Sequence, residues 1–419
     1  MREMKDSGTV WLGTIPANWD IARIGSFYRL RNTKVSDTDY PPLSVTNKGV
    51  VPQLETAAKT NAHDDRKLVK KGDFAINSRS DRRGSCGIAP CDGSVSLINT
   101  ILSPMGEMNP RYYDWLFHTI EFGDEFYKCG HGIVDDLWTT GWQDMKKIRI
   151  PYPSLAEQEK IADVLDSQCS DIDAISADIQ KEIEILEQFK RSIITEAVTK
   201  GVNPEAEMKD SGIEWVGNIP AHWDTIPIRY LFAECRLKNI LNQEKTALKF
   251  TYGTIIKKTN FDSDSDEYVA NTMTNYTVVY PGTIMINGLN LNYDFVSQRV
   301  GLVKDRGAIT SAYLAIVPGS RVVSEYANYQ LKSWDYAKAF HNMGTGVRKT
   351  LDFSELGKKY FVTPSIEEQS KIVAFLDSKC KEIEAIIASK KQQLTVIDSY
   401  KKSLIYEYVT GKKEVPAQN

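Results

Sequence analysis

The sequence predicts an α+β protein in which two mixed α/β domains are separated by two long antiparallel coiled-coil helices, with approximate two-fold symmetry. Two repeated phrases and a seven-residue apolar spacing lead to this prediction. The first phrase, EMKDSGTVWLGTIPANWD from Glu3, returns as EMKDSGIEWVGNIPAHWD from Glu207, with thirteen of eighteen letters identical. Self-similarity on this scale indicates an internal duplication.

A second phrase marks the other end of each repeat. PSLAEQEKIADVLDSQCSDIDAI begins at Pro153 and PSIEEQSKIVAFLDSKCKEIEAI at Pro364, with thirteen of twenty-three positions identical. The first phrase recurs after 204 residues and the second after 211, so the block between them is longer and much changed in the second copy. We therefore expect four segments: head 1 (1–152), a helical spacer (153–205), head 2 (206–363) and a second helical spacer (364–419).

Each head is predicted to be mixed α/β, with short strands and frequent turns. Trp19 and Trp223 close the first phrase in the two copies and are expected to anchor the first strand of each head by burying aromatic surface. The stretches 72–77 and 282–287 are predicted to be one element, a glycine turn that leads into an apolar strand ending in Asn. A helix and a Gly-x-Gly turn are expected to follow this strand in both heads.

The second phrase is predicted to open a long helix in both copies. Ser154 with Glu157, and Ser365 with Glu368, form a Ser-x-x-Glu capping box, and Gly201 and Gly411 are expected to end the helices. A strict seven-residue apolar spacing then predicts a coiled-coil seam. Its members are Leu165, Ile172, Ile179, Leu186, Ile193, Leu376, Ile383, Ile397 and Leu404. Lys390 interrupts the second run, and Ile161, Ile175 and Phe189 are predicted to be the companion position of the first.

The chain order of head, helix, head, helix constrains how the two helices pair. A helix from about 155 to 200 would be about 70 Å long and needs a partner for its apolar stripe. If the first helix carries the chain away from head 1, the second can pack on it only by running back. The predicted pair is therefore antiparallel, with the heads at opposite ends of a spacer. Cys169 and Cys380 are expected to be packing residues near the seam.

Composition and motifs argue against a catalytic centre. The chain has 42% hydrophobic and 26% charged residues, which is typical of a globular protein, and its net charge of −3 does not by itself favour nucleic acid. No P-loop, GxGxxG or HExxH pattern is present. Cys86, Cys91, Cys129 and His131 could be imagined around zinc, but without a CxxC pair they are better interpreted as packing residues. The N-terminus lacks the apolar core of a signal peptide, which favours the cytoplasm, and no stretch is long enough to span a membrane.

Basic, amide and aromatic side chains in the diverged blocks are the candidate DNA contacts. Arg is matched in geometry to guanine and Asn to adenine, while Lys suits phosphates. The candidates in head 1 are Thr46, Asn47, Lys48, Arg79, Arg82 and Arg83. Those in head 2 are Tyr252, Lys257, Lys258, Asn287, Asn290, Asn292, Arg348 and Lys349. The stretch IIKKTN in head 2 is interpreted as the counterpart of TNKG in head 1.

The combination resembles the specificity subunit of Type I restriction-modification systems. The resemblance rests on two divergent heads, each opened by a G-x-IP-x-x-W phrase and followed by a P-S-x-x-EQ-x-KI helix, and it covers essentially the whole chain. It implies a protein without catalysis of its own. Each head would be a target recognition domain that reads one half of a bipartite, gapped site in double-stranded DNA, and the helices would set the gap.

The same resemblance implies the partners and cofactors. Two methyltransferase subunits would dock on the chain, and restriction subunits would join them. S-adenosylmethionine, ATP and magnesium would belong to these partners, and this chain would hold no cofactor. Two alternatives are kept: a self-contained DNA-modifying enzyme, which should show a catalytic motif, and a coiled-coil scaffold without DNA readout, which leaves the divergence of the heads unexplained.

Overall fold

The chain folds into two compact units, which divide both long helices between them. The computed structural model describes residues 2–53, 64–79, 82–132, 138–258, 273–292, 298–344, 346 and 349–416. Unit 1 comprises Met1–Gln180 and Lys391–Asn419, and unit 2 comprises Lys181–Lys390. Each unit therefore contains one head, the beginning of the helix that follows this head and the final part of the other long helix. The boundaries of the four segments expected from the sequence stay predictions.

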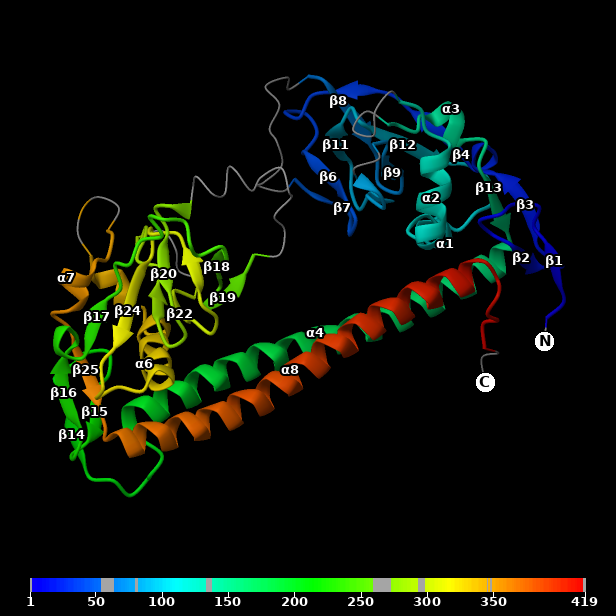
Figure 1. Cartoon of the computed structure of the whole chain (residues 1–419). Helices are drawn as coiled ribbons and strands as arrows, with labels where there is room; N and C mark the ends of the chain where they lie inside the picture. Colours follow the sequence, from blue (N-terminus) through cyan, green and yellow to red (C-terminus); the bar gives the residue numbers. More distant parts are fainter. Residues whose placement is uncertain are drawn as a thin grey trace. The chain divides into compact units, whose positions relative to one another are not determined.

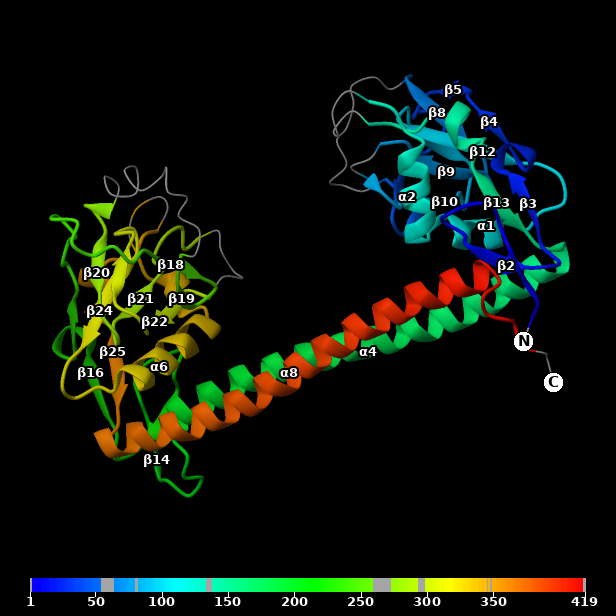
Figure 2. The same cartoon turned by 45° about the vertical axis from the view of Figure 1, so that its right-hand side comes forward.

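Head 1 is built around a four-stranded antiparallel sheet of order β10-β9-β12-β4. Short hairpins and a smaller sheet surround it, and α1 packs beside it (Figure 2). Its strands are β1 (Met4–Asp6), β2 (Thr14–Pro16), β3 (Asp20–Arg23), β4 (Tyr28–Arg31), β5 (Lys34–Val35), β6 (Leu43–Thr46), β7 (Gly49–Pro52), β8 (Arg66–Val69), β9 (Phe74–Asn77), β10 (Cys86–Ile88), β11 (Gly93–Ser96), β12 (Asn99–Pro104) and β13 (Arg149–Tyr152). Its helices are α1 (Pro110–Phe117), α2 (Ile120–Lys128) and α3 (Trp142–Met145).

Head 2 repeats this topology, with a central sheet of order β22-β21-β24-β17. Its strands are β14 (Met208–Asp210), β15 (Asn218–Pro220), β16 (Asp224–Pro227), β17 (Phe232–Glu234), β18 (Leu248–Thr251), β19 (Thr254–Lys257), β20 (Thr277–Val279), β21 (Ile284–Ile286), β22 (Val300–Leu302), β23 (Gly307–Ile309), β24 (Leu314–Pro318) and β25 (Tyr360–Thr363). Its helices are α6 (Ser324–Tyr336) and α7 (Phe353–Leu356). The predicted equivalence of β9 and β21 is confirmed because their neighbours correspond. β9 lies between β10 and β12, and β21 lies between β22 and β24.

The two long helices are α4 (Leu155–Lys200) and α8 (Ile366–Val409), which lie side by side (Figures 1 and 2). In unit 1 Lys401 pairs with Asp173, and in unit 2 Lys190 pairs with Glu384. A later residue of α8 thus meets an earlier residue of α4, which confirms the antiparallel pairing. Gly201 and Gly411 follow the helices with positive φ angles of 77° and 70°, so both expected helix ends are confirmed.

The core of each head includes the ends of both long helices. In unit 1 Trp19 is fully buried in a cluster that contains Leu165 and Cys169 of α4 and Leu404 of α8. In unit 2 Trp223 is fully buried in a cluster that contains Ile194 and Val198 of α4 with Leu376 and Cys380 of α8. Both tryptophan anchors and the packing role of both cysteines are therefore confirmed.

Five of the nine predicted seam residues are buried and four are half-buried, whereas the predicted companion position in α4 is buried at Ile161 but wrong at its other two residues. Ile175 and Phe189 are 53% and 54% exposed. The residues turned inward are one position later, at Ser176 and Lys190, on the same repeat as the buried Cys169 and Ile183. Polar residues at two of these positions hide the true stripe in the sequence. Lys390, which interrupts the seam of α8, forms an ion pair with Glu182 of α4.

Candidate nucleic-acid interface

Three candidate residues of head 1, Arg79, Arg82 and Arg83, lie on the loop between β9 and β10, which we call the arginine loop (78–85). Asn77 ends β9 with a buried side chain, and its Oδ1 accepts a hydrogen bond from the Arg79 backbone N–H at 3.0 Å. Ser78 donates through its backbone and its hydroxyl to the Ile98 carbonyl. The Thr140 N–H donates to the Ser78 carbonyl at 3.0 Å. The start of the loop is therefore fixed on two sides.

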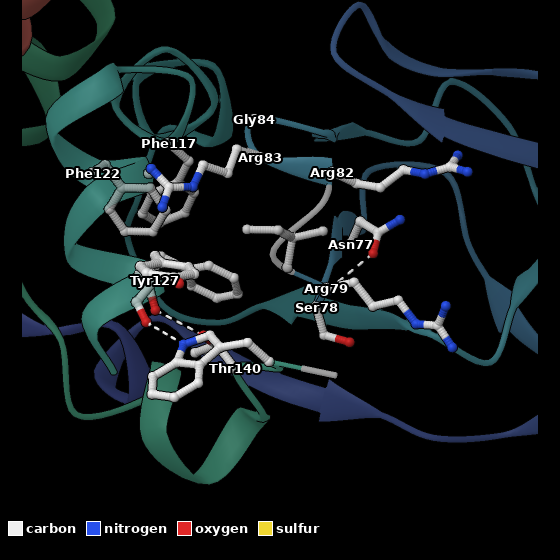
Figure 3. Close-up of a pocket in the computed structure, with 14 residues that line it drawn as sticks. Asn77, Ser78, Arg79, Arg82, Arg83, Gly84, Phe117, Phe122, Tyr127 and Thr140 are labelled. Atoms are coloured by element: carbon white, nitrogen blue, oxygen red, sulfur yellow. Dashed lines mark hydrogen bonds between the residues drawn. The ribbon is translucent and has the colours of Figure 1, made fainter. Parts of the chain in front are cut away.

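The three arginines of this loop have different surroundings. Figure 3 shows Arg79 and Arg82 extending to the same side of the loop, with Asn77 between them. Arg83 turns the other way, over the Tyr127 ring at 4.1 Å, and its guanidinium lies 2.9 Å from the Asp124 carboxylate. Its charge is already paired on the surface of α2. All three arginines line the pocket that also contains Phe117, Phe122 and Tyr127, and Arg79 and Arg82 differ from Arg83 in the side to which they extend.

The β6–β7 turn brings Thr46, Asn47 and Lys48 close to the arginine loop. A Cβ atom on Gly87, just after that loop, would lie 2.7 Å from the Gly49 Cα, so the two backbones are in direct contact. Asn47 and Lys48 are exposed at the tip of the turn. The Thr46 hydroxyl donates to the Gly49 carbonyl and accepts from the Lys48 N–H, so it stabilises the turn itself.

Head 2 has the same close approach, and it corrects one sequence expectation. A Cβ atom added to Gly301 would lie 3.1 Å from the Gly253 carbonyl oxygen. This contact corresponds to the one between Gly87 and Gly49 in head 1. The counterpart of the head 1 turn is therefore TYGT, with Tyr252 74% exposed at its tip, and IIKKTN is not the counterpart. Lys257 lies at the far end of β19, where it pairs with Asp305 at 2.9 Å. Lys258 follows directly, with its N–H bonded to the Ala247 carbonyl.

The loop after β21, which we call the asparagine loop (287–292), lies where head 1 has its arginine loop. The Leu291 N–H donates to the Lys349 carbonyl at 3.1 Å, and the Leu351 N–H donates to the Gly288 carbonyl at 2.9 Å. Leu291 is fully buried, whereas the preceding Asn290 is exposed with a φ of 49°.

The other predicted residues of this loop differ in their accessibility. Asn287 is half-buried and its Oδ1 accepts from the Leu289 N–H, while Asn292 is half-buried at the end of the loop. Lys349 contacts the His341 carbonyl at 3.5 Å, and Arg348 lies outside the described residues. Asn290 is therefore the asparagine that is presented to solvent.

Sequence reasoning missed the buried Arg299, which lies behind this loop. Only its place in a diverged block could have pointed to it.

The described part of the chain shows no assembled metal centre. It contains no group of three or more His, Cys, Asp or Glu side chains that could hold a metal ion. Burial raises the pKa of the Cys86 thiol well above its usual range, which disfavours the thiolate that binds zinc. Asn109, in the stretch NPRYY, is the N-cap of α1 and accepts hydrogen bonds from the Arg111 and Tyr112 N–H groups, which is a structural role.

Two matching groups of apolar side chains are exposed on the long helices. In unit 1 these are Ile175, Val396 and Tyr400, and in unit 2 Ile386, Ile185 and Phe189, all 46–60% exposed. We call them apolar patches 1 and 2. Ile175 and Ile386 occupy the same position of the sequence repeat, as do Ile185 with Val396 and Phe189 with Tyr400. Each patch therefore takes one side chain from one helix and an i, i+4 pair from the other.

Comparison with known proteins identifies the class to which this architecture corresponds. Two heads of one topology, each completed by the ends of two antiparallel helices, form a duplicated scaffold. The family model described as Type I restriction modification DNA specificity domain matches residues 138–185. The chain is 23% identical, over 97% of its length and 95% of the relative's, to the Type I restriction enzyme MjaVIII specificity subunit of Methanocaldococcus jannaschii. It is 25% identical to the putative type I restriction enzyme MjaX specificity subunit of the same organism, over 65% of this chain and 60% of that one.

Solved structures show the same fold. A chain from a structure of complex assembly and conformational transition of the type I R-M system matches with a TM-score of 0.71 at 12% identity, over 95% of this chain and 99% of that one. The HsdS subunit from Thermoanaerobacter tengcongensis matches with a TM-score of 0.50 at 15% identity, over 95% and 98%. The resemblance to specificity subunits of Type I restriction-modification systems that the sequence predicts is confirmed. No helix among the described residues is both long and apolar enough to cross a membrane.

Proposed function

We propose that this chain is the DNA-specificity subunit of a Type I restriction-modification complex, and that each head reads one half of a bipartite, gapped target. One observation carries the proposal. In both heads a glycine contact joins a hairpin turn to the strand that follows the loop after the central strand, and this following strand is β10 in head 1 and β22 in head 2. The turn and this loop carry Arg79 and Arg82 in head 1, but Tyr252 and Asn290 in head 2. A repeated frame with different base-reading side chains is what an asymmetric target requires.

The two heads are expected to prefer different bases. Arg side chains pair in a bidentate manner with guanine and Asn side chains with adenine. Head 1 is therefore expected to read a half-site with guanine at its core, and Asn290 of head 2 to read an adenine. The exposed ring of Tyr252 suits contact with a base or sugar beside that adenine. Lys48 and Lys258, both exposed, suit phosphates.

The partners follow from the matched apolar patches. Exposed apolar side chains gathered in one place mark interaction sites, and two equivalent patches suit two copies of one partner. We propose that each patch receives one methyltransferase subunit. Catalysis, and with it S-adenosylmethionine, ATP and magnesium, would be carried by the methyltransferase and restriction subunits. The net charge of −3 supports this division, because a chain close to neutral gains from partners that supply part of the phosphate contacts.

The test is a genome-wide map of N6-methyladenine in the host, with this gene intact and with it deleted. The methyltransferase and restriction genes stay in place. We expect one two-part motif with a fixed gap to lose its methylation on deletion. Unchanged methylation, together with no sequence-dependent DNA binding by the purified complex of this chain and its methyltransferase, would leave the scaffold alternative.

A further inference from the structure

Arg299 is a fully buried arginine whose side chain holds the asparagine loop from behind. It has no exposed surface, although arginine is almost never fully buried in proteins without partners. Its Nη1 donates to the Asn287 carbonyl and to the Leu289 carbonyl, both at 2.9 Å. These two carbonyls flank Gly288 and lie just before Asn290. A charged donor therefore fixes the backbone from which the exposed asparagine projects.

The backbone of Arg299 is fixed as well. Its N–H donates at 2.8 Å to Oδ2 of Asp335, a buried carboxylate on α6, and its carbonyl accepts from the Asn287 N–H at 2.8 Å. The asparagine loop is thus tied through Arg299 to the helix behind the central sheet. On its other side the loop is bonded to the segment 349–351, and an added Cβ on Gly288 would lie 2.7 Å from the Leu351 carbonyl.

Head 1 closes its loop without such an arginine. The bond from the Asn287 N–H to the Arg299 carbonyl in head 2 corresponds to the bond from the Asn77 N–H to the Ser85 carbonyl in head 1. Ser85 thus stands where head 2 has Arg299. Ser78, at the start of the arginine loop, is fixed by bonds to Ile98 and Thr140. In head 2 the Arg299 guanidinium satisfies two carbonyls of the asparagine loop.

We propose that Arg299 is a positioning residue for base recognition by head 2, which holds Asn290 at a fixed place and orientation and so sets the base preference of one half-site. This inference rests on the proposed function for its biological meaning. The structural part, that Arg299 orders the asparagine loop, can be tested without DNA. Arg299 does not touch the base itself, because it is fully buried.

The first experiment is hydrogen exchange on the purified full-length chain, wild type and Arg299→Lys. The amides of Asn287, Leu289 and Leu291 report on the loop through their bonds to Arg299, Asn287 and Lys349. A lysine cannot reproduce the two-carbonyl contact of a guanidinium. We expect these amides to exchange at least about tenfold faster in the variant, which is the scale of losing hydrogen bonds to a charged group.

The matched control is Arg66→Lys, the same chemical change at a buried arginine of unit 1. Arg66 donates to the Ser94 hydroxyl and carbonyl, far in sequence from the asparagine loop, and its loss is expected to leave the three amides unchanged. Equal exchange in wild type and Arg299→Lys would overturn the proposal. If the variant does not fold, the wild type alone decides, because unprotected amides at Asn287, Leu289 and Leu291 would also overturn it.

The second experiment maps methylation in cells that carry each variant. We expect Arg299→Lys to relax base preference in one half-site by about tenfold or more, since positioning errors cost discrimination between bases, while the other half-site is kept. A preference unchanged in both half-sites would contradict the proposal. A wild-type map without any two-part motif would instead contradict the proposed function, and the exchange result would still decide whether Arg299 orders the loop.

Discussion

At the scale of single residues, two buried glutamines explain why the phrase EQ is repeated. Gln158 and Gln369 are fully buried in the first turn of the long helices. Each accepts a hydrogen bond at 2.8 Å from a backbone N–H at the start of a helix in its own head, at Asn109 and Val323. Each donates to the carbonyl of the preceding proline, at Pro153 and Pro364. One side chain therefore joins each head to its long helix.

Replacing Gln369 with Ala is expected to lower the free energy of unfolding of unit 2 by about 1–3 kcal/mol. The reason is that the Val323 N–H and the carbonyls of Arg321 and Pro364 would lose their partner inside the protein. Chemical unfolding followed by tryptophan fluorescence measures the change. Ser370→Ala on the exposed side of the same turn is the control, and an equal effect of both variants would contradict this role of Gln369.

Asp335 is expected to make stability depend on pH in the direction opposite to that of a paired carboxylate. Burial is the largest influence on this group and raises its pKa, against smaller lowering influences that include the Arg299 N–H. The folded state therefore holds the proton more tightly than the unfolded state, where the pKa is about 3.9. The stabilisation is complete below that value and is lost as pH rises through the raised folded pKa.

Asp335→Asn removes this dependence because an amide does not titrate. We expect the free energy of unfolding of the variant, relative to wild type, to increase as the pH rises above about 4. Urea unfolding at a series of pH values measures it, with the exposed Asp305→Asn as a control for general charge effects. If the free energy of unfolding changes with pH in the same way for wild type and Asp335→Asn, Asp335 keeps its ordinary pKa.

At the scale of elements, the long helices carry buried and exposed apolar residues within one heptad repeat. Seam residues such as Leu376 and Leu404 are buried, while Ile386 and Tyr400 are exposed, one position before the buried Ile387 and before Lys401, which pairs with Asp173 of α4. In an antiparallel pair, the positions just before the seam lie on the same side of both helices. Lys190, which follows Phe189, pairs with Glu384, two residues before Ile386, so both helices contribute to patch 2.

Changing all three residues of patch 2, Ile386, Ile185 and Phe189, to Ser is expected to remove one of two methyltransferase subunits from the complex. The free energy of unfolding should change little, since these side chains are exposed. By contrast, replacing the buried Leu376 with Ala is expected to lower the free energy of unfolding by about 2–5 kcal/mol. Native mass spectrometry of the assembled complex measures the stoichiometry. The matched control changes Ile175, Val396 and Tyr400 of patch 1, and should remove the other copy. Two bound subunits in both triple variants would exclude the patches as docking sites.

The sequence is sufficient for the regular elements and insufficient for the site. Capping boxes, end glycines and seven-residue spacing are local signals, and α4 follows the expected range of about 155–200. The companion position is wrong at Ile175 and Phe189 because Ser176 and Lys190 face inward while these apolar neighbours face solvent. The counterpart of the head 1 turn is set by strand register, which similarity of letters does not show. The glycine contacts and the buried Arg299 join segments distant in sequence, which no local pattern shows.

At the scale of the whole molecule, the duplication separates what must stay constant from what must vary. The constant parts are the tryptophan anchors and the long helices, which contribute to the core of each unit, and the buried glutamines. The variable parts are the hairpin turns, which the glycine contacts hold against β10 and β22, and the loops that precede these strands. Because each unit has its own core, a change in the loops of one head is expected to leave the other head folded. Under the proposed function, two heads on one frame with different loops would read an asymmetric target.

The continuity of α4 and α8 through both units leads to a prediction about the gap in the target. If the helices set the distance between the half-sites, four residues inserted after Gln180 in α4 and after Lys390 in α8 should add about 6 Å. That is about two base pairs at ~3.4 Å each. One apolar residue in each insert lets the seam continue as a local change of the heptad repeat.

The methylation map should show the same two half-sites with a longer gap. Half-sites kept at the original gap would mean that the helices do not measure distance, and loss of all methylation with a folded chain would mean that the longer spacing cannot be bound. An insert of four residues in the loop after Gly201, outside the helix, is the control and should leave the gap unchanged.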